Sequence, residues 1–108
     1  MKTEDFKNKI KEILENKKAK EIAEIFVREK TSITDYFVIA SGKSIIQVKS
    51  LAENLDFELS KIGIEPKRIE GYKDCKWILM DYGDVIVHIF LQEVRNQYSL
   101  EDLWNKNN

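Results

Sequence analysis

The sequence predicts an α/β (α+β) domain in which a mixed β-sheet of about five strands is flanked by helices. Three observations support this expectation. A stripe with helical spacing opens the chain, a long amphipathic stretch follows an apolar β-type run, and three more β-type runs come after it. Because 108 residues with 43% hydrophobic content suffice for one core, we expect a single domain over residues 1–108.

The first segment has the pattern of an amphipathic helix over residues 4–16. Thr3 is the expected N-cap, and Glu4 and Asp5 suit the positive end of the helix dipole. The apolar stripe consists of Phe6, Ile10, Ile13 and Leu14.

The next apolar stretch is ambiguous. Residues 19–27 fit a helical stripe, whereas residues 25–27 are also a β-compatible run, so periodicity does not decide between helix and strand. Residues 36–40 are rich in aromatic and β-branched side chains and end at Ser41-Gly42. This run predicts a strand, and its continuous apolarity predicts a central position with both faces buried.

The middle of the chain carries the clearest helix. Ser44 and Gln47 form a capping-box pattern, and Gly63 marks the end of the helical spacing. The apolar positions between them are Val48, Leu51, Ala52, Leu55, Leu59 and Ile62. We expect this helix to pack on one face of the sheet as the crossover between strands.

After Pro66 the pattern predicts a strand over residues 68–71 and a hairpin formed by residues 77–80 and 85–90. Residues 81–84 have the composition of a tight turn. A last helix is expected to begin at Ser99. Its apolar side chains, Leu100, Leu103 and Trp104, should pin it to the sheet.

Charge and cysteine content exclude several classes. With 18 Lys+Arg against 19 Asp+Glu, the chain lacks the positive field that favours RNA as the main partner. The lysines of residues 7–20 alternate with acidic residues, so a solvated helix face is expected there, with at most a peripheral RNA contact. No segment predicts secretion or a membrane span, and the single Cys75 predicts no disulfide, so a cytoplasmic location is expected.

Several blocks carry a family pattern in consistent order and spacing: residues 31–42, Glu70-Gly71, Trp77, residues 81–90, Arg95, Tyr98 and Leu103-Trp104. Together they resemble the ribosomal silencing factor (Iojap-like) family. The resemblance covers residues 19–104 and leaves residues 1–18 as an N-terminal helix and its connection. Residues 73–76 depart from it, because the family is expected to have a glycine in this turn.

The resemblance implies an α/β fold distantly similar to nucleotidyltransferases but without their catalytic apparatus. It also implies that residues 22–28 are the first strand. Members of the family bind the large-subunit ribosomal protein numbered fourteen, block joining of the small subunit, and lower translation when nutrients are scarce. A homodimer is implied when the protein is off the ribosome.

The hairpin supplies the candidate partner-binding residues. Trp77 is either a partly exposed anchor or a core tryptophan. Asp81, Tyr82 and Asp84 either form an acidic and aromatic docking tip or an ordinary turn. The resemblance favours docking for all four residues.

Three further residues are secondary candidates. A lone strand histidine such as His88 is usually a hydrogen-bonded structural residue, but the resemblance places it at the edge of the docking surface. Glu70 and Lys73 either form weak ion pairs across that surface or are simply solvated, as exposed charges commonly are.

The sequence does not predict an enzyme, a cofactor or a metal site. Asp81 and Asp84 flank a turn instead of alternating on one strand face, and no phosphate-binding glycine precedes Ser41. With His88 as the only histidine, a hydrolase triad lacks support, and no sequence feature supplies a base that would activate the Cys75 thiol. The alternatives to a translation repressor are an RNA-binding accessory module of ribosome assembly and a degenerate nucleotide-binding domain.

Overall fold

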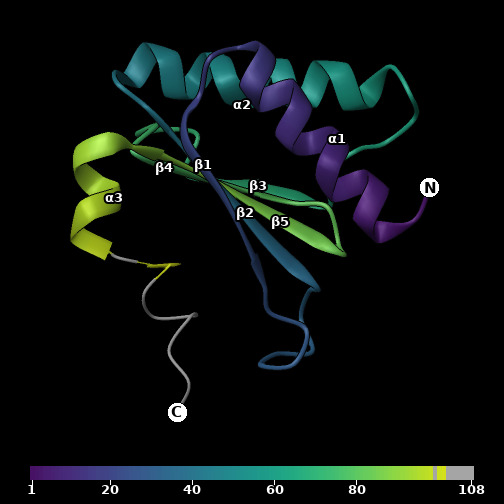
Figure 1. The fold of residues 1–108 in the computed structure, drawn as a ribbon. Helices are drawn as coiled ribbons and strands as arrows, with labels where there is room; N and C mark the ends of the chain where they lie inside the picture. The colour runs from purple at the N-terminus through teal and green to yellow at the C-terminus, as the bar shows by residue number, and fades with distance from the viewer. Residues whose placement is uncertain (99, 102–108) are drawn as a thin grey trace.

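The computed structural model describes residues 1–98 and 100–101, which form three helices and five strands (Figure 1). The helices are α1 (Thr3–Asn16), α2 (Ile45–Ser60) and α3 (Gln92–Tyr98). The strands are β1 (Lys20–Phe26), β2 (Tyr36–Gly42), β3 (Arg68–Glu70), β4 (Trp77–Asp81) and β5 (Val85–Leu91). They form one sheet in the order β1-β2-β5-β4-β3, in which only the β2–β5 pair is parallel. The predicted mixed sheet is therefore confirmed.

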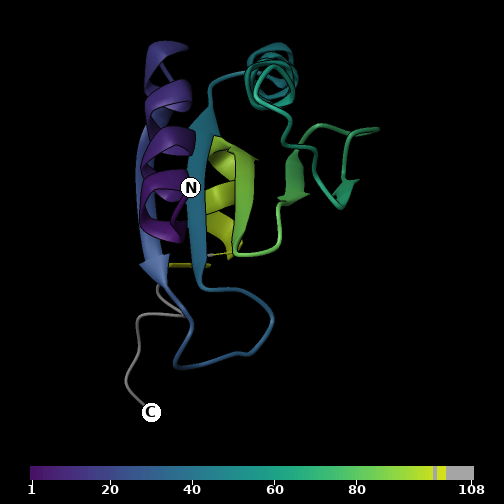
Figure 2. The ribbon, with the colours of Figure 1, turned by 90° about the vertical axis from the view of Figure 1, so that its right-hand side faces the viewer.

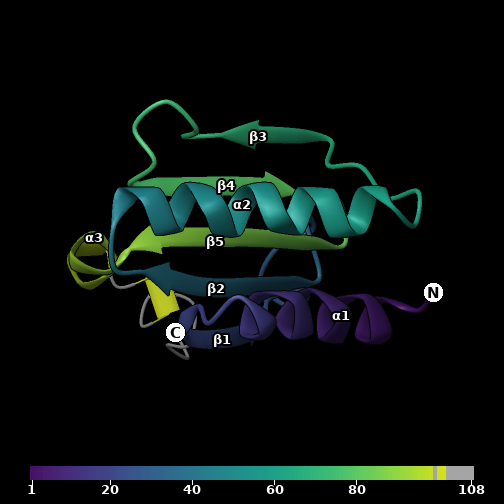
Figure 3. The same cartoon turned by 90° about the horizontal axis from the view of Figure 1, so that it is seen from above.

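The helices divide unequally between the two faces of the sheet. Helices α1 and α2 lie side by side over one face, and seen from above they cover β1, β2 and β5 (Figure 3). Helix α3 lies at one end of the sheet, directed away from α1 and α2 (Figures 1 and 2). One face is thus covered along its length, and the other has a helix only at one end.

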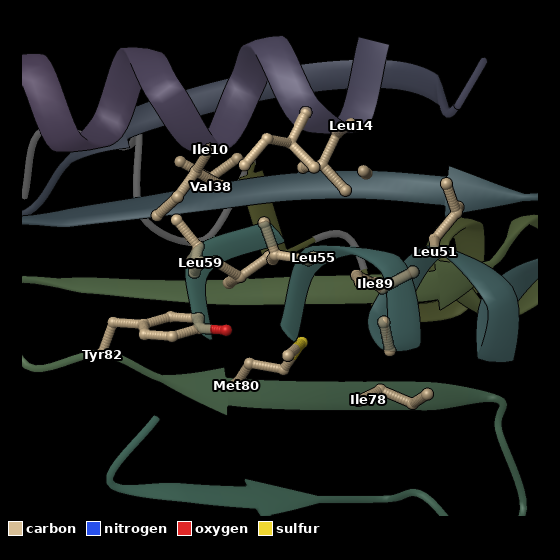
Figure 4. Packing of buried hydrophobic residues seen from close by; sticks show 14 of the residues in the cluster. Ile10, Leu14, Val38, Leu51, Leu55, Leu59, Ile78, Met80, Tyr82 and Ile89 are labelled. Atoms are coloured by element: carbon tan, nitrogen blue, oxygen red, sulfur yellow. The ribbon is translucent and has the colours of Figure 1, made fainter. Parts of the chain in front are cut away.

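The main core lies between the sheet and the two covering helices (Figure 4). The predicted apolar stripes of α1 and α2 are buried there. Ile10, Leu14, Leu55 and Leu59 meet the strands with almost no exposure to solvent. Strand β5 is buried over its whole length, as expected for the central strand of the sheet.

The predicted N-cap is confirmed for α2 but not for α1. The Ser44 hydroxyl accepts a hydrogen bond from the Gln47 backbone N–H at 3.1 Å, which confirms the predicted cap of α2. The predicted cap at Thr3 is wrong, because Thr3 is already inside α1 and its hydroxyl donates to Asp84 at 3.2 Å. The side chain prefers this tertiary partner, which brings the start of α1 to the β4–β5 turn.

The ambiguous stretch is a strand, as the resemblance implied. Strand β1 pairs with β2, but the register shifts between Lys20 and Ala23, and Glu21 has a φ of +48°. This irregularity breaks the period-two alternation, which explains why the sequence pattern did not decide between helix and strand.

Two parts of the second half differ from expectation. Helix α3, which the sequence did not predict, begins at Gln92. The predicted helix start at Ser99, with Leu103 and Trp104, lies outside the described residues. In the glycine-poor turn before β4, Cys75 takes a φ of +56°, and its thiol donates to the Tyr72 carbonyl at 3.0 Å. The left-handed conformation that glycine usually supplies is therefore adopted by cysteine.

Candidate functional site

The candidate site is the sheet face turned away from α1 and α2, called here the open face. Its residues alternate along three strands, and cross-strand pairs such as Leu79–His88 and His88–Ile39 point to the same side. The open face consists of Trp77, Leu79 and Asp81 of β4, Ile86, His88 and Phe90 of β5, and Phe37 and Ile39 of β2. Helix α3 borders it at the end where β4 begins.

Trp77 is held from three directions although it is only half-buried. Its ring stacks on Phe90, with centroids 4.8 Å apart and planes at 26°, and it contacts the Tyr98 ring at 4.8 Å. The indole N–H donates to Nδ1 of His88 at 3.0 Å. Trp77 is thus a fixed aromatic side chain with part of its surface accessible, so it is neither a fully buried core residue nor a fully exposed one.

A groove of about 430 Å³ runs beside Trp77 between the β3–β4 loop and α3. Tyr98, which is 56% exposed, contributes to the groove from the helix side. The other lining residues are Gly71, Asp74, Lys76, Leu91, Glu93, Val94 and Gln97. This mixture of aromatic, apolar and charged groups, with a volume of a few side chains, suits part of a protein partner.

His88 lies at the centre of the open face and is buried, at 4% exposure. Burial lowers the pKa of its imidazole to about 4, so the ring is neutral at physiological pH. The ring packs edge-on against Phe37 at 4.7 Å. His88 is therefore the hydrogen-bonded structural residue that its type predicts, and the expectation that it lies at the edge of an accessible surface is wrong.

Tyr82 does not lie with the other hairpin candidates. Its ring is buried on the helix-covered side, edge-on to Phe6 of α1 at 5.7 Å (Figure 4). Among the described residues its hydroxyl has no hydrogen-bond partner, and burial raises the pKa of this phenol. The expected exposed anchor is wrong at this position, because the ring closes the core beneath α1 more favourably than it would face water.

The two acidic turn residues have partners within the chain. Asp81 is half-buried: one carboxylate oxygen accepts from the Gly83 N–H at 2.9 Å, and the other lies 3.4 Å from Nε of Arg68. Asp84 is exposed and accepts from the Thr3 hydroxyl. The contacts of an ordinary turn, one of the two alternatives for these residues, are therefore present. The carboxylate of Asp84 remains accessible.

Glu70 and Lys73 lie towards the β3 edge. Glu70 pairs with Leu79 in register, so its side chain is on the open side, where it forms an ion pair with Arg68 at 2.8 Å. Lys73 is exposed in the β3–β4 loop. The structure therefore brings Trp77, Asp81 and Glu70 to one side, with His88 beneath them.

Sequence reasoning missed the contribution of α3. Leu91, Val94 and Tyr98 recur at helical spacing, which is the signal that predicts a helix here. Arg95 of this helix is 4% exposed, and its guanidinium donates to the Ser41 hydroxyl at 2.8 Å. It also binds both carboxylate oxygens of Glu101, at 3.0 and 2.8 Å, which lowers the pKa of that carboxyl.

These contacts fix α3, and with it Tyr98, against the end of the sheet. Leu100 packs against the buried apolar residues of the open face, as the sequence predicted.

Over residues 1–98 and 100–101, no three His, Cys, Asp or Glu side chains are grouped as metal ligands. None of the helices in that part of the chain has the length and apolar character needed to span a bilayer.

Comparison with known proteins places these features in a family context. The family described as "Ribosomal silencing factor during starvation" matches residues 1–108. The ribosomal silencing factor of Halalkalibacterium halodurans is 40% identical over 91 residues, which cover 84% of this chain and 78% of that protein. A mouse protein named "Mitochondrial assembly of ribosomal large subunit protein 1" is 34% identical over 95 residues, covering 85% of this chain and 42% of its own length.

Solved structures agree with this similarity. A crystal structure of a Chromobacterium violaceum protein superposes with a TM-score of 0.94 at 34% identity, covering all of this chain (100%) and 90% of the other. A Bacillus halodurans crystal structure gives a TM-score of 0.85 at 33% identity, covering 97% of this chain and 98% of the other. The five-stranded sheet with its three helices is thus shared with these proteins.

Proposed function

The chain belongs to the ribosomal silencing factor family, and from this premise we propose that it represses translation by binding the large ribosomal subunit and excluding the small one. The proposed contact is the large-subunit protein numbered fourteen. In this proposal the protein acts in the cytoplasm when nutrients are limited, and it forms a homodimer when it is off the ribosome.

The observation that carries the proposal is the fixed, half-exposed Trp77 beside the α3 groove. A tryptophan that is immobilised before binding loses little rotamer freedom in the complex, and central aromatic anchors supply much of the energy of protein interfaces. A groove next to the anchor gives the partner a place for a complementary apolar side chain. The part of the open face around Trp77 therefore has the features of a protein-docking surface. The rest of that face, formed by Phe37, Ile39, Ile86, His88 and Phe90, is a second buried cluster that supports it.

The charged residues around Trp77 suit a basic partner. Asp74 and Glu93 line the groove with Lys76 as its one basic lining residue among those described. Asp84 is exposed, but its carboxylate accepts from Thr3 and so lies towards α1, away from this groove. Such rim charges steer the encounter more than they add to affinity. The proposed contact set is accordingly centred on Trp77, with Asp81, Glu70 and Lys73 at its rim.

Repression would follow from shape alone. With the open face on the large subunit, the helix layer of α1 and α2 points outwards, and a body of 37 × 34 × 22 Å stands where the second subunit would approach. No covalent step is needed, because two bodies cannot occupy the same volume. An interface of about 800 Å² per partner is attainable for a domain of this size.

Co-sedimentation with large subunits tests the docking face. Trp77→Ala should shift the protein from the large-subunit fraction to the top of the gradient, since loss of a central anchor costs at least about 2 kcal/mol, or roughly thirtyfold in affinity. Phe57→Ala is the matched control, because Phe57 is a 60% exposed aromatic on α2, in the opposite layer. Equal co-migration of both variants would contradict the proposed face.

A role in large-subunit assembly is the second candidate, and the name of the mouse relative favours it. A cell that lacks an assembly factor accumulates incomplete large subunits, whereas loss of a silencing factor leaves them complete. Analysis of the protein content of large subunits from a deletion strain separates these two outcomes.

A further inference from the structure

We infer that His88 is a positioning residue for Trp77: by accepting the indole N–H from beneath the open face, it selects the one orientation in which Trp77 is presented to the partner. This inference rests on the proposed docking function and deepens it. In this role His88 acts through Trp77 and does not itself contact the partner.

The hydrogen bond defines the state of the imidazole. The Trp77 indole N–H is a donor only, so Nδ1 of His88, at 3.0 Å, must be the acceptor. A neutral imidazole then carries its proton on Nε2. Within the described residues this Nε2 is buried and has no hydrogen-bond partner.

The unsatisfied Nε2–H argues against a role in packing alone. The neighbours of the imidazole include the Phe37 ring at 4.7 Å and the Phe90 ring at 6.3 Å, and a phenylalanine would fill such a site without burying an unpaired donor. A histidine here is therefore unfavourable for stability except through its bond to Trp77. Buried polar groups kept at such a cost commonly mark a functional requirement.

Stacking by itself does not fix the indole. The torsion between Cβ and an aromatic ring has two broad minima. A rotation of about 180° would keep the indole plane against Phe90 but exchange the positions of the N–H edge and the fused six-membered ring. Only one of the two orientations satisfies His88 Nδ1. The histidine thus fixes the indole orientation in the free protein, so that binding does not have to supply the free energy of selecting it.

Two substitutions separate the acceptor from the ring. His88→Phe keeps an aromatic ring and removes the acceptor, whereas His88→Asn places an amide oxygen near the position of Nδ1. We expect His88→Phe to weaken binding to purified large subunits by about five- to tenfold, the worth of one preorganising hydrogen bond. His88→Asn should recover most of that loss.

The indole N–H reports on the same bond without any partner. In a ¹⁵N–¹H spectrum of the free protein, the Trp77 indole signal of His88→Phe should move upfield and exchange faster with solvent, while His88→Asn stays close to the wild type. Thermal unfolding shows whether each variant is folded. If His88→Phe does not fold, His88→Gln takes its place. The longer glutamine side chain carries its amide oxygen past the indole N–H, so this variant also lacks the acceptor at the position of Nδ1.

A double-mutant cycle distinguishes positioning from general stabilisation. In a Trp77→Phe background there is no indole N–H to position, so His88→Phe should cause no further loss of large-subunit binding. An equal loss in both backgrounds, or wild-type affinity of folded His88→Phe, would overturn the inference. If the wild-type protein itself fails to bind large subunits, the proposed function fails, while the indole spectrum still decides whether His88 fixes Trp77.

Discussion

Lowering the pH from 7.5 to 5.0 should destabilise the fold through His88. Its folded-state pKa is about 4, below the ordinary value of 6.5, because burial disfavours the imidazolium. In this range the unfolded chain binds a proton that the folded chain excludes, so the free energy of unfolding falls as the pH falls. The contribution of His88 to the free energy of unfolding is fully present above pH 6.5 and declines as the pH falls from there towards 4.

The size of the effect follows from the two pKa values. Their difference of about 2.5 corresponds to about 3 kcal/mol once both forms are protonated in acid, at about 1.4 kcal/mol for each pKa unit. By pH 5.0, the linkage relation gives a loss of about 2 kcal/mol relative to pH 7.5. This is a large fraction of the 5–15 kcal/mol that roughly bounds the stability of a small domain.

Urea unfolding at several pH values measures this loss, with His88→Phe as the comparison. The carboxyl groups of Glu4, Glu24 and Glu101 have lowered pKa values, so their contributions are lost only in more acidic solution and are common to both proteins. The difference between the two proteins therefore isolates His88. A wild-type stability that does not change between pH 7.5 and 5.0, or the same slope in His88→Phe, would refute the reasoning.

Three further substitutions test the packing around the site, each by the free energy of unfolding in urea. Tyr82→Phe should change it by less than about 0.5 kcal/mol, because the hydroxyl that it removes has no partner in the part of the chain that the structure describes, and a large loss would reveal a missed partner. Gly71→Ala should cost more than about 2 kcal/mol, since a Cβ would lie 1.9 Å from the Trp77 carbonyl oxygen at a φ of +83°; near-wild-type stability would contradict this geometry. Glu101→Gln should cost about 1 to 2 kcal/mol, because it leaves the buried Arg95 with only the more distant carboxylate of Glu21 at 3.9 Å, and no change would show that α3 is held otherwise.

The local pattern was sufficient for most of the fold. The Ser44 cap, the stripes of the two long helices and the β4–β5 hairpin were all predicted, because each depends on neighbours within a few residues. Strand β1 was different, since its register shift disturbs the alternation by which a strand is recognised. There the family resemblance supplied what periodicity did not.

The site was less predictable because its geometry is non-local. Whether Tyr82 faces solvent depends on Phe6, which is distant in sequence and reaches it only after α1 has packed on the sheet. Similarly, Thr3 is a plausible cap until Asp84 offers a tertiary partner. Trp77 was identified correctly as a candidate for exposure, but its hydrogen bond to His88 and its contact with Tyr98 required the structure.

Light scattering during subunit joining tests the central claim most directly. Purified large and small subunits are mixed at a magnesium concentration that favours association, after the large subunits have been incubated with an excess of the protein. The account predicts that the wild type and Phe57→Ala suppress the scattering increase, and that Trp77→Ala suppresses it far less. Full association in the presence of excess wild-type protein would contradict the account.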